Sequence, residues 1–147
     1  MTNTELIDLL NELTAFPSET DWIEVKMGKG SITDEQIGEY ISAMSNGATV
    51  ANKPFGYLVW GVEDGTHTIK GTNFSFIRAK HGGNQELELF LRINLYPKIN
   101  FEIFEFDFIT TTKVMQRIRN IKYKFFPDNE LLATMVDKYD TRSIFLK

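Results

Sequence analysis

The stretch from Gly56 to Val62 constrains the fold more than any other part of this 147-residue sequence. It reads GYLVWGV, an almost continuous apolar run that begins with a glycine and has a second glycine near its end. A short run of this kind is typical of a central strand that is buried on both faces. The chain is long enough to bury about two thirds of its unfolded surface in one domain. We therefore expect a single domain over residues 1–147, with this strand inside its sheet.

Two helices are predicted by capping boxes, in which a threonine is followed three residues later by Glu or Gln. The first box is Thr2-x-x-Glu5, and it opens a leucine-rich helix that runs to Thr14. The second is Thr33-x-x-Gln36, and its helix is expected to close at residues 45–47, Ser-Asn-Gly, where Asn or Gly can take the left-handed position. A third helix is predicted from Gln85 to about Leu95, after the polar loop 80–84.

The remaining strands are predicted by alternation of apolar and polar residues. In 21–27, Glu24 and Lys26 share one face while Ile23 and Val25 share the other. Residues 67–71 are the expected hairpin partner of the central strand, across an acidic turn at 63–65. In 99–108 the phenylalanines change parity, which indicates either a bulge or a strand buried on both faces. A last helix is expected after Pro127. The order predicts an α+β fold with a mixed or antiparallel sheet flanked by helices.

The charge is unevenly distributed along the chain. The net charge is −4, which argues against a uniformly basic nucleic-acid-binding surface. The segment 109–126, however, has five basic residues and no acid, so the rest of the chain carries −9. The five are Lys113, Arg117, Arg119, Lys122 and Lys124. A local phosphate-binding patch and a simple solvated cationic segment both remain open.

Other features bear on the compartment and on membranes. Cysteine is absent, which excludes disulfides and thiolate metal sites and is compatible with a reducing cytoplasm. We find no secretory signal and no apolar run near the ~20 residues that span a bilayer. We therefore expect a cytoplasmic protein with no membrane partner.

Several spaced motifs together resemble one known family. They are Glu19-x-x-x-x-Glu24-x-Lys26, the Ser45-Asn46 pair on the second helix, and 56-GYLVWGVEDGTHTIKGTNF-74, followed by 83–108. Over about residues 17–108 this pattern is similar to the Schlafen AlbA-type domain. The resemblance implies a DNA-binding domain of the kind found in bacterial and archaeal transcriptional regulators and helicase-related proteins. After Phe108 the family's next strand looks shortened or missing, so residues 109–147 are expected to be atypical.

The resemblance also implies a carboxylate site. In animal Schlafen relatives three carboxylates are implicated in metal-dependent RNA cleavage, and they correspond here to Glu19, Glu24 and Asp64, with Glu63 as an alternative for the third. Mg²⁺ or Mn²⁺ prefers such oxygen ligands and can activate water beside a phosphate. No other cofactor is expected. The alternative is an ordinary acidic turn, with Glu24 in an ion pair with Lys26.

Three function hypotheses follow. The first is a nucleic-acid-binding domain whose partner is DNA or RNA. Its phosphate contacts would come from Lys26, Lys29 and the five basic residues above. The second is a metal-dependent endoribonuclease or nuclease that uses the carboxylates. The third is a module for self-association, as a homo-oligomer, or for binding another protein. His67 and His81 are interpreted as polar surface residues, and the phenylalanines of 101–108 as core.

Overall fold

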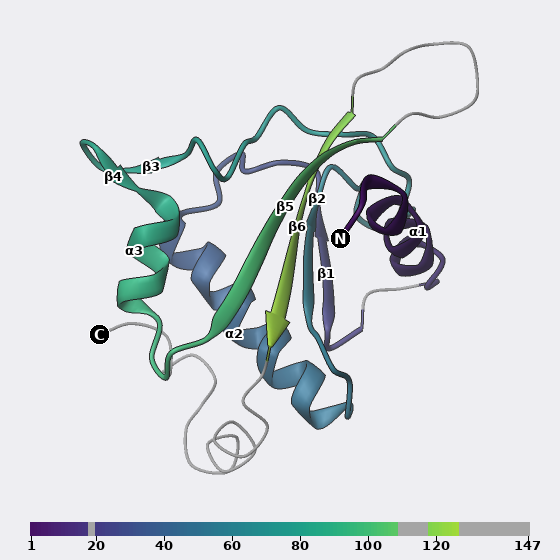
Figure 1. The fold of residues 1–147 in the computed structure, drawn as a ribbon, viewed down its shortest axis with the longest axis horizontal. Coiled ribbons are helices and arrows are strands. Elements are labelled where there is room, and N and C mark those ends of the chain that lie inside the picture. The colour runs from purple at the N-terminus through teal and green to yellow at the C-terminus, as the bar shows by residue number, and fades with distance from the viewer. Residues whose placement is uncertain (18–19, 109–117, 127–147) are drawn as a thin grey trace.

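The structure, a computed structural model, describes residues 1–17, 20–108 and 118–126, the last of these as backbone (Figure 1). The main sheet has the strand order β1-β2-β6-β5. Its strands are β1 (Ile23–Lys26), β2 (Tyr57–Trp60), β5 (Asn100–Phe108) and β6 (Ile118–Phe126). β1 runs parallel to β2, and the other neighbours are antiparallel. The predicted α+β fold with a mixed sheet is therefore confirmed.

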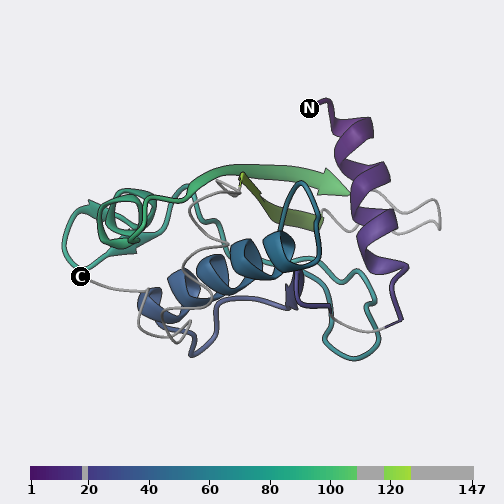
Figure 2. The same ribbon diagram turned by 90° about the horizontal axis from the view of Figure 1, so that it is seen from below.

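The described residues form three helices, α1 (Asn3–Thr14), α2 (Asp34–Val50) and α3 (Leu87–Asn94), and α3 packs against α2. Both predicted capping boxes form. At the start of α2 the Thr33 hydroxyl accepts from the Gln36 amide at 3.1 Å, and the Gln36 side chain accepts from the Thr33 amide at 2.9 Å. Figures 1 and 2 show α2 crossing one side of the sheet and α1 lying on the other side, near β1 and β2. No helix in the described ranges is long and apolar enough to cross a membrane.

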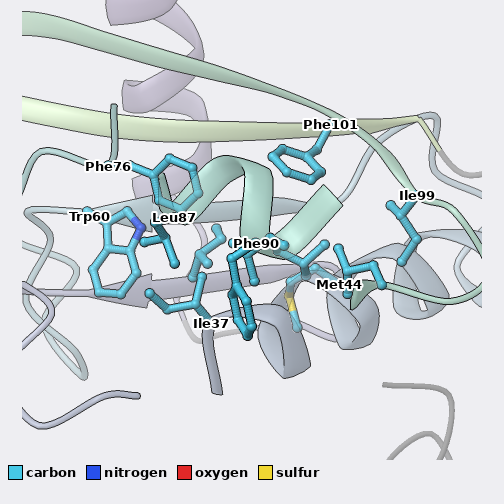
Figure 3. Close-up of a cluster of buried hydrophobic side chains, with 12 residues drawn as sticks. Ile37, Met44, Trp60, Phe76, Leu87, Phe90, Ile99 and Phe101 are labelled. Carbon is cyan, nitrogen blue, oxygen red and sulfur yellow. The ribbon is translucent and has the colours of Figure 1, made fainter. Parts of the chain in front are cut away.

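The core has two parts, one on each face of the sheet. Leu58 and Trp60 of β2 pack with α2 and α3, in the cluster drawn in Figure 3. Tyr57 and Val59 of the same strand pack with α1. All four β2 side chains are buried, and β2 lies between β1 and β6. The prediction of a central strand buried on both faces is thus confirmed.

The change of parity in β5 has the same cause. Phe101 packs in the cluster of α2 and α3, whereas Phe106 and Phe108 pack in the cluster of α1. The pairing with β6 runs without interruption from Asn100 to Phe108, so there is no bulge. Of the two predicted explanations, burial on both faces is the right one, and the interpretation of these phenylalanines as core is confirmed.

The predicted end of α2 is wrong. The helix continues through Gly47 to Val50. At Gly47 a Cβ atom would lie 1.7 Å from the carbonyl oxygen of Asp21. The glycine is therefore present because the backbone before β1 packs directly against the helix, and not because the chain turns there.

Two further boundaries differ from the predictions. Residues 67–71 do not form a strand. They are joined to the segment that follows β2 by a single bridge between Val62 and Ile69 and by a few backbone hydrogen bonds, such as those from the Lys70 and Gly71 amides to the Gly61 carbonyl. Gln85 and Glu86 belong to a strand, not to the third helix. They form β4 (Gln85–Glu86), which pairs with β3 (Lys80–His81) in a small hairpin. Gly82 and Gly83, both with positive φ, make its turn, so the segment 80–84 is more ordered than a plain loop.

The strand expected to be shortened or missing would lie between Phe108 and Ile118, outside the described residues. β6 begins at Ile118, has nine residues and forms the second interior strand of the sheet. Its apolar residues follow no strict alternation, and basic residues lie between them. Its position depends on pairing with β2 and β5, which local sequence does not reveal. The helix predicted after Pro127 lies outside the described residues.

Candidate nucleic-acid interface

The basic residues of segment 109–126 fall into two groups. Lys113 and Arg117 lie in the connection between β5 and β6, outside the described residues. Arg119, Lys122 and Lys124 lie on β6, where the backbone register is known. The basic segment therefore includes an interior strand of the sheet.

The register of β6 places acids opposite two of its three basic positions. Arg119 pairs with Asp107, and Lys124 pairs with Glu102 on β5. Oppositely charged residues in direct cross-strand positions attract one another. The remaining basic position is flanked by apolar residues on both neighbouring strands. The basic positions of this segment are thus not equivalent in the charge that they can offer to a phosphate.

Glu24 and Lys26 form an ion pair along the edge strand β1. The Glu24 side chain is 15% exposed and that of Lys26 is 22% exposed. The Lys26 ammonium also lies 4.9 Å from the centre of the Tyr40 ring on α2. The pair therefore sits in the partly covered space between β1 and α2, and its two charges largely offset each other.

Lys29 belongs to a second charged cluster, at the start of α2. Its ammonium is 2.6 Å from Asp34 Oδ1, and His81 Nδ1 is 2.7 Å from Asp34 Oδ2. Burial raises the pKa of Asp34, but the hydrogen bonds and charges of Lys29 and His81 outweigh it, so the pKa is lowered from the ordinary 3.8. The ionised Asp34 thus opposes the charge that Lys29 would present to a phosphate.

The two histidines differ from their sequence interpretation as polar surface residues. His81 is half-buried, and its ring stacks on Phe90 of α3 with 3.5 Å between centroids. His67 is buried, with 7% of its surface exposed. Sequence reasoning missed the contact of His81 with Asp34. The signal that could have indicated a hairpin here is the Gly82-Gly83 pair, which makes the turn between β3 and β4.

The implied carboxylate site is only partly described. Glu19 lies outside the described residues. Glu24 of β1 is paired with Leu58 of β2, whereas Asp64 lies exposed in the turn that follows β2. The end of β1 meets this turn region through the amides of Gly61 and Val62, which donate to the carbonyl of Lys26. The oxygen ligands suit Mg²⁺ or Mn²⁺, but within the described ranges no three acids or histidines are grouped to hold a metal.

Comparison with known proteins agrees with this fold. A model of the family Schlafen, AlbA_2 matches residues 19–142, which extends well beyond the expected limit at Phe108 and includes all of β6. No curated protein matches the sequence. The family broadly indicates a function related to nucleic acid. Because the match covers most of the sequence, the chain belongs to the Schlafen AlbA_2 family.

Proposed function

We propose that this domain binds nucleic acid through phosphate contacts from the basic segment 109–126. The observation that carries the proposal is the distribution of charge. Within the described residues, Lys26 and Lys29 are held beside Glu24 and Asp34. The basic segment has five cations and no acid of its own. It is therefore the part of the chain best supplied with charge for a polyanion.

The register of β6 ranks the candidate contacts. In the backbone register, Arg119 and Lys124 stand opposite acids of β5, whereas no such pairing is described for Lys113 and Arg117. Lys113 and Arg117 precede β6, in the connection from β5. We expect this connection to supply more phosphate contacts than the strand does. In a transcriptional regulator, such contacts would hold the domain on duplex DNA.

The test is a binding series with duplex DNA, single-stranded DNA and RNA between about 50 and about 200 mM salt. Log affinity should fall linearly with log salt. The double variant Lys113→Ala/Arg117→Ala should reduce the slope by about two, because each lost phosphate contact removes about one. The matched variant Arg119→Ala/Lys124→Ala should change it less. Absence of salt-dependent binding to all three nucleic acids would overturn the proposal.

A second candidate function is metal-dependent cleavage of RNA. It is supported by Glu24, a partly buried carboxylate in the position of a family acid, with Lys26 beside it. A divalent cation would activate water and stabilise charge on the phosphate. Glu24 and Asp64, together with Glu19, would have to supply its ligands. Lys26 would hold the Glu24 carboxylate ionised and in place.

This candidate is tested by incubating the chain with structured RNA in the presence and absence of Mn²⁺. Cleavage should require the metal and should be abolished in Glu24→Gln. Glu102→Gln, which changes an exposed carboxylate on β5, should keep full activity. Cleavage that survives Glu24→Gln would refute the carboxylate site, and circular dichroism of each variant would show that the fold is retained.

A further inference from the structure

An aromatic recess lies between α1 and the starts of β1 and β2. It has a volume of about 190 Å³, and its lining includes Glu12, Trp22, Lys53, Phe55 and Tyr57. A second cavity of about 300 Å³ is also lined by Glu12, together with residues 15–17. Drug-sized ligands occupy pockets of about 300–1,000 Å³, so the recess suits a single ring system. We refer to the two cavities together as the α1 recess.

The rings at the α1 recess form a continuous series. Phe16 and Trp22 are edge to face with centroids 5.4 Å apart, and Trp22 and Tyr57 follow at 6.0 Å. Phe55 and Tyr57 continue the series at 6.4 Å. Phe16, Trp22 and Phe55 are only partly buried. Partly exposed aromatic rings gathered at a concave surface are typical of a binding site.

Two opposite charges border these rings. The Lys53 ammonium lies 5.0 Å from the centre of the Trp22 ring. Glu12 lines both cavities. The pKa of the Tyr57 phenol is raised, first by burial and second by the nearby charge of Glu12. A suitable ligand therefore has a flat ring, a hydrogen-bond donor for a carboxylate and an anionic group for Lys53.

We propose that the α1 recess binds a base of single-stranded nucleic acid and favours bases that carry an exocyclic amino group. Stacking on aromatic side chains is how single strands are held, and a carboxylate accepts a hydrogen bond from the amino group of cytosine. Lys53 would contact the adjoining phosphate. The register also places Lys124 of β6 beside Tyr57, so the basic segment adjoins the recess. The inference rests on the proposed function and adds a base-binding site to it.

The experiment titrates the full chain with oligo(dC) and oligo(dT) of equal length and follows tryptophan fluorescence. Trp60 is fully buried, so quenching reports Trp22. Oligo(dC) should bind several-fold more tightly than oligo(dT). Glu12→Ala should remove this preference, whereas Asp8→Ala, one turn away on the exposed side of α1, should keep it. Lys53→Ala should weaken both oligonucleotides, and Lys70→Ala, an exposed lysine beyond β2, should weaken neither.

Trp22→Ala should weaken binding about tenfold, the order expected for one lost stacking contact. Glu12 and Lys53 are exposed, so their variants test the site even where Trp22→Ala fails to fold. Salt-dependent binding without tryptophan quenching, or a preference unchanged by Glu12→Ala, would overturn the base site and leave the proposed function standing. Failure of every nucleic acid to bind would overturn both.

Discussion

The Nδ1 atom of His81 lies 2.7 Å from a carboxylate oxygen of Asp34, which joins β3 to the first turn of α2. The same ring stacks on Phe90 of α3. One imidazole therefore connects β3 and α3 with the start of α2, which is far from both in the sequence. Lys29, from the loop after β1, reaches the other oxygen of the same carboxylate. This cluster fixes the β3–β4 hairpin to the body of the domain.

Asp34→Asn should lower the free energy of unfolding by about 1–2 kcal/mol at neutral pH, because it weakens charge-assisted hydrogen bonds to Lys29 and His81. The pKa of Asp34 is lowered in the folded state. Its stabilising effect is therefore complete above the ordinary value of 3.8 and is lost as pH falls through the lowered pKa. Urea unfolding at several pH values should show the wild type and the variant converging in acid. The exposed Asp8→Asn should change stability by less than ~0.5 kcal/mol at every pH.

Gly47→Ala should destabilise the domain although alanine is the better helix former. Propensity alone would stabilise α2 by about 1 kcal/mol. The new methyl group would instead lie 1.7 Å from the carbonyl oxygen of Asp21, so the helix or the segment before β1 must move. We expect a net loss of about 1–3 kcal/mol, as for other overpacked sites. Thermal unfolding measures it, and Ala43→Gly on the exposed side of α2 gives the ordinary propensity difference. An increase in stability for Gly47→Ala would contradict the close packing.

Ser45→Ala should preserve or raise stability. The Ser45 side chain is fully buried in α2, and its hydroxyl has no hydrogen-bond partner among the residues that the structure describes. A buried polar group without a partner carries a desolvation penalty of about 1–3 kcal/mol, which alanine removes. Thr49→Val is the contrasting variant. The Thr49 hydroxyl donates to the Ser45 carbonyl at 3.1 Å, so its removal should lower stability. Differential scanning calorimetry of both variants measures whether their changes in stability have opposite signs. A clear loss of stability in Ser45→Ala would show that the Ser45 hydroxyl has a hydrogen-bond partner.

Glu105→Ala should destabilise the loop that carries Phe76 into the core. The Glu105 carboxylate accepts from the Ser75 hydroxyl at 2.9 Å and from the Ile77 amide at 3.0 Å. Its removal leaves both donors without this acceptor, and we expect a loss of about 1.5–3 kcal/mol. Faster hydrogen exchange at the Ile77 amide would locate the effect.

Glu102→Ala is the control for this change. Glu102 lies on the same strand, but it is exposed. Its variant should leave exchange at the Ile77 amide unchanged. Equal exchange rates in the two variants would contradict an anchoring role for Glu105.

Features encoded by a few neighbouring residues were predicted from the sequence. The capping boxes at Thr2 and Thr33 form because the partners are three residues apart and meet within one helical turn. The apolar run of β2 is buried on both faces because neither face carries a charged side chain. The family motifs, from Glu24 to the glycine-rich turn, are also local patterns, and the family match confirms the resemblance.

Features that depend on distant partners were decided only by the tertiary structure. Gly47 stands inside α2 because the backbone of Asp21 packs against it, and a glycine looks the same in sequence whether it ends a helix or lets another segment approach. β6 becomes an interior strand only by pairing with β2 and β5. The meeting of His81 with Asp34, 47 residues apart, likewise follows from packing. Sequence determines such local preferences, while nonlocal pairing decides which charges are neutralised within the fold and which remain for a ligand.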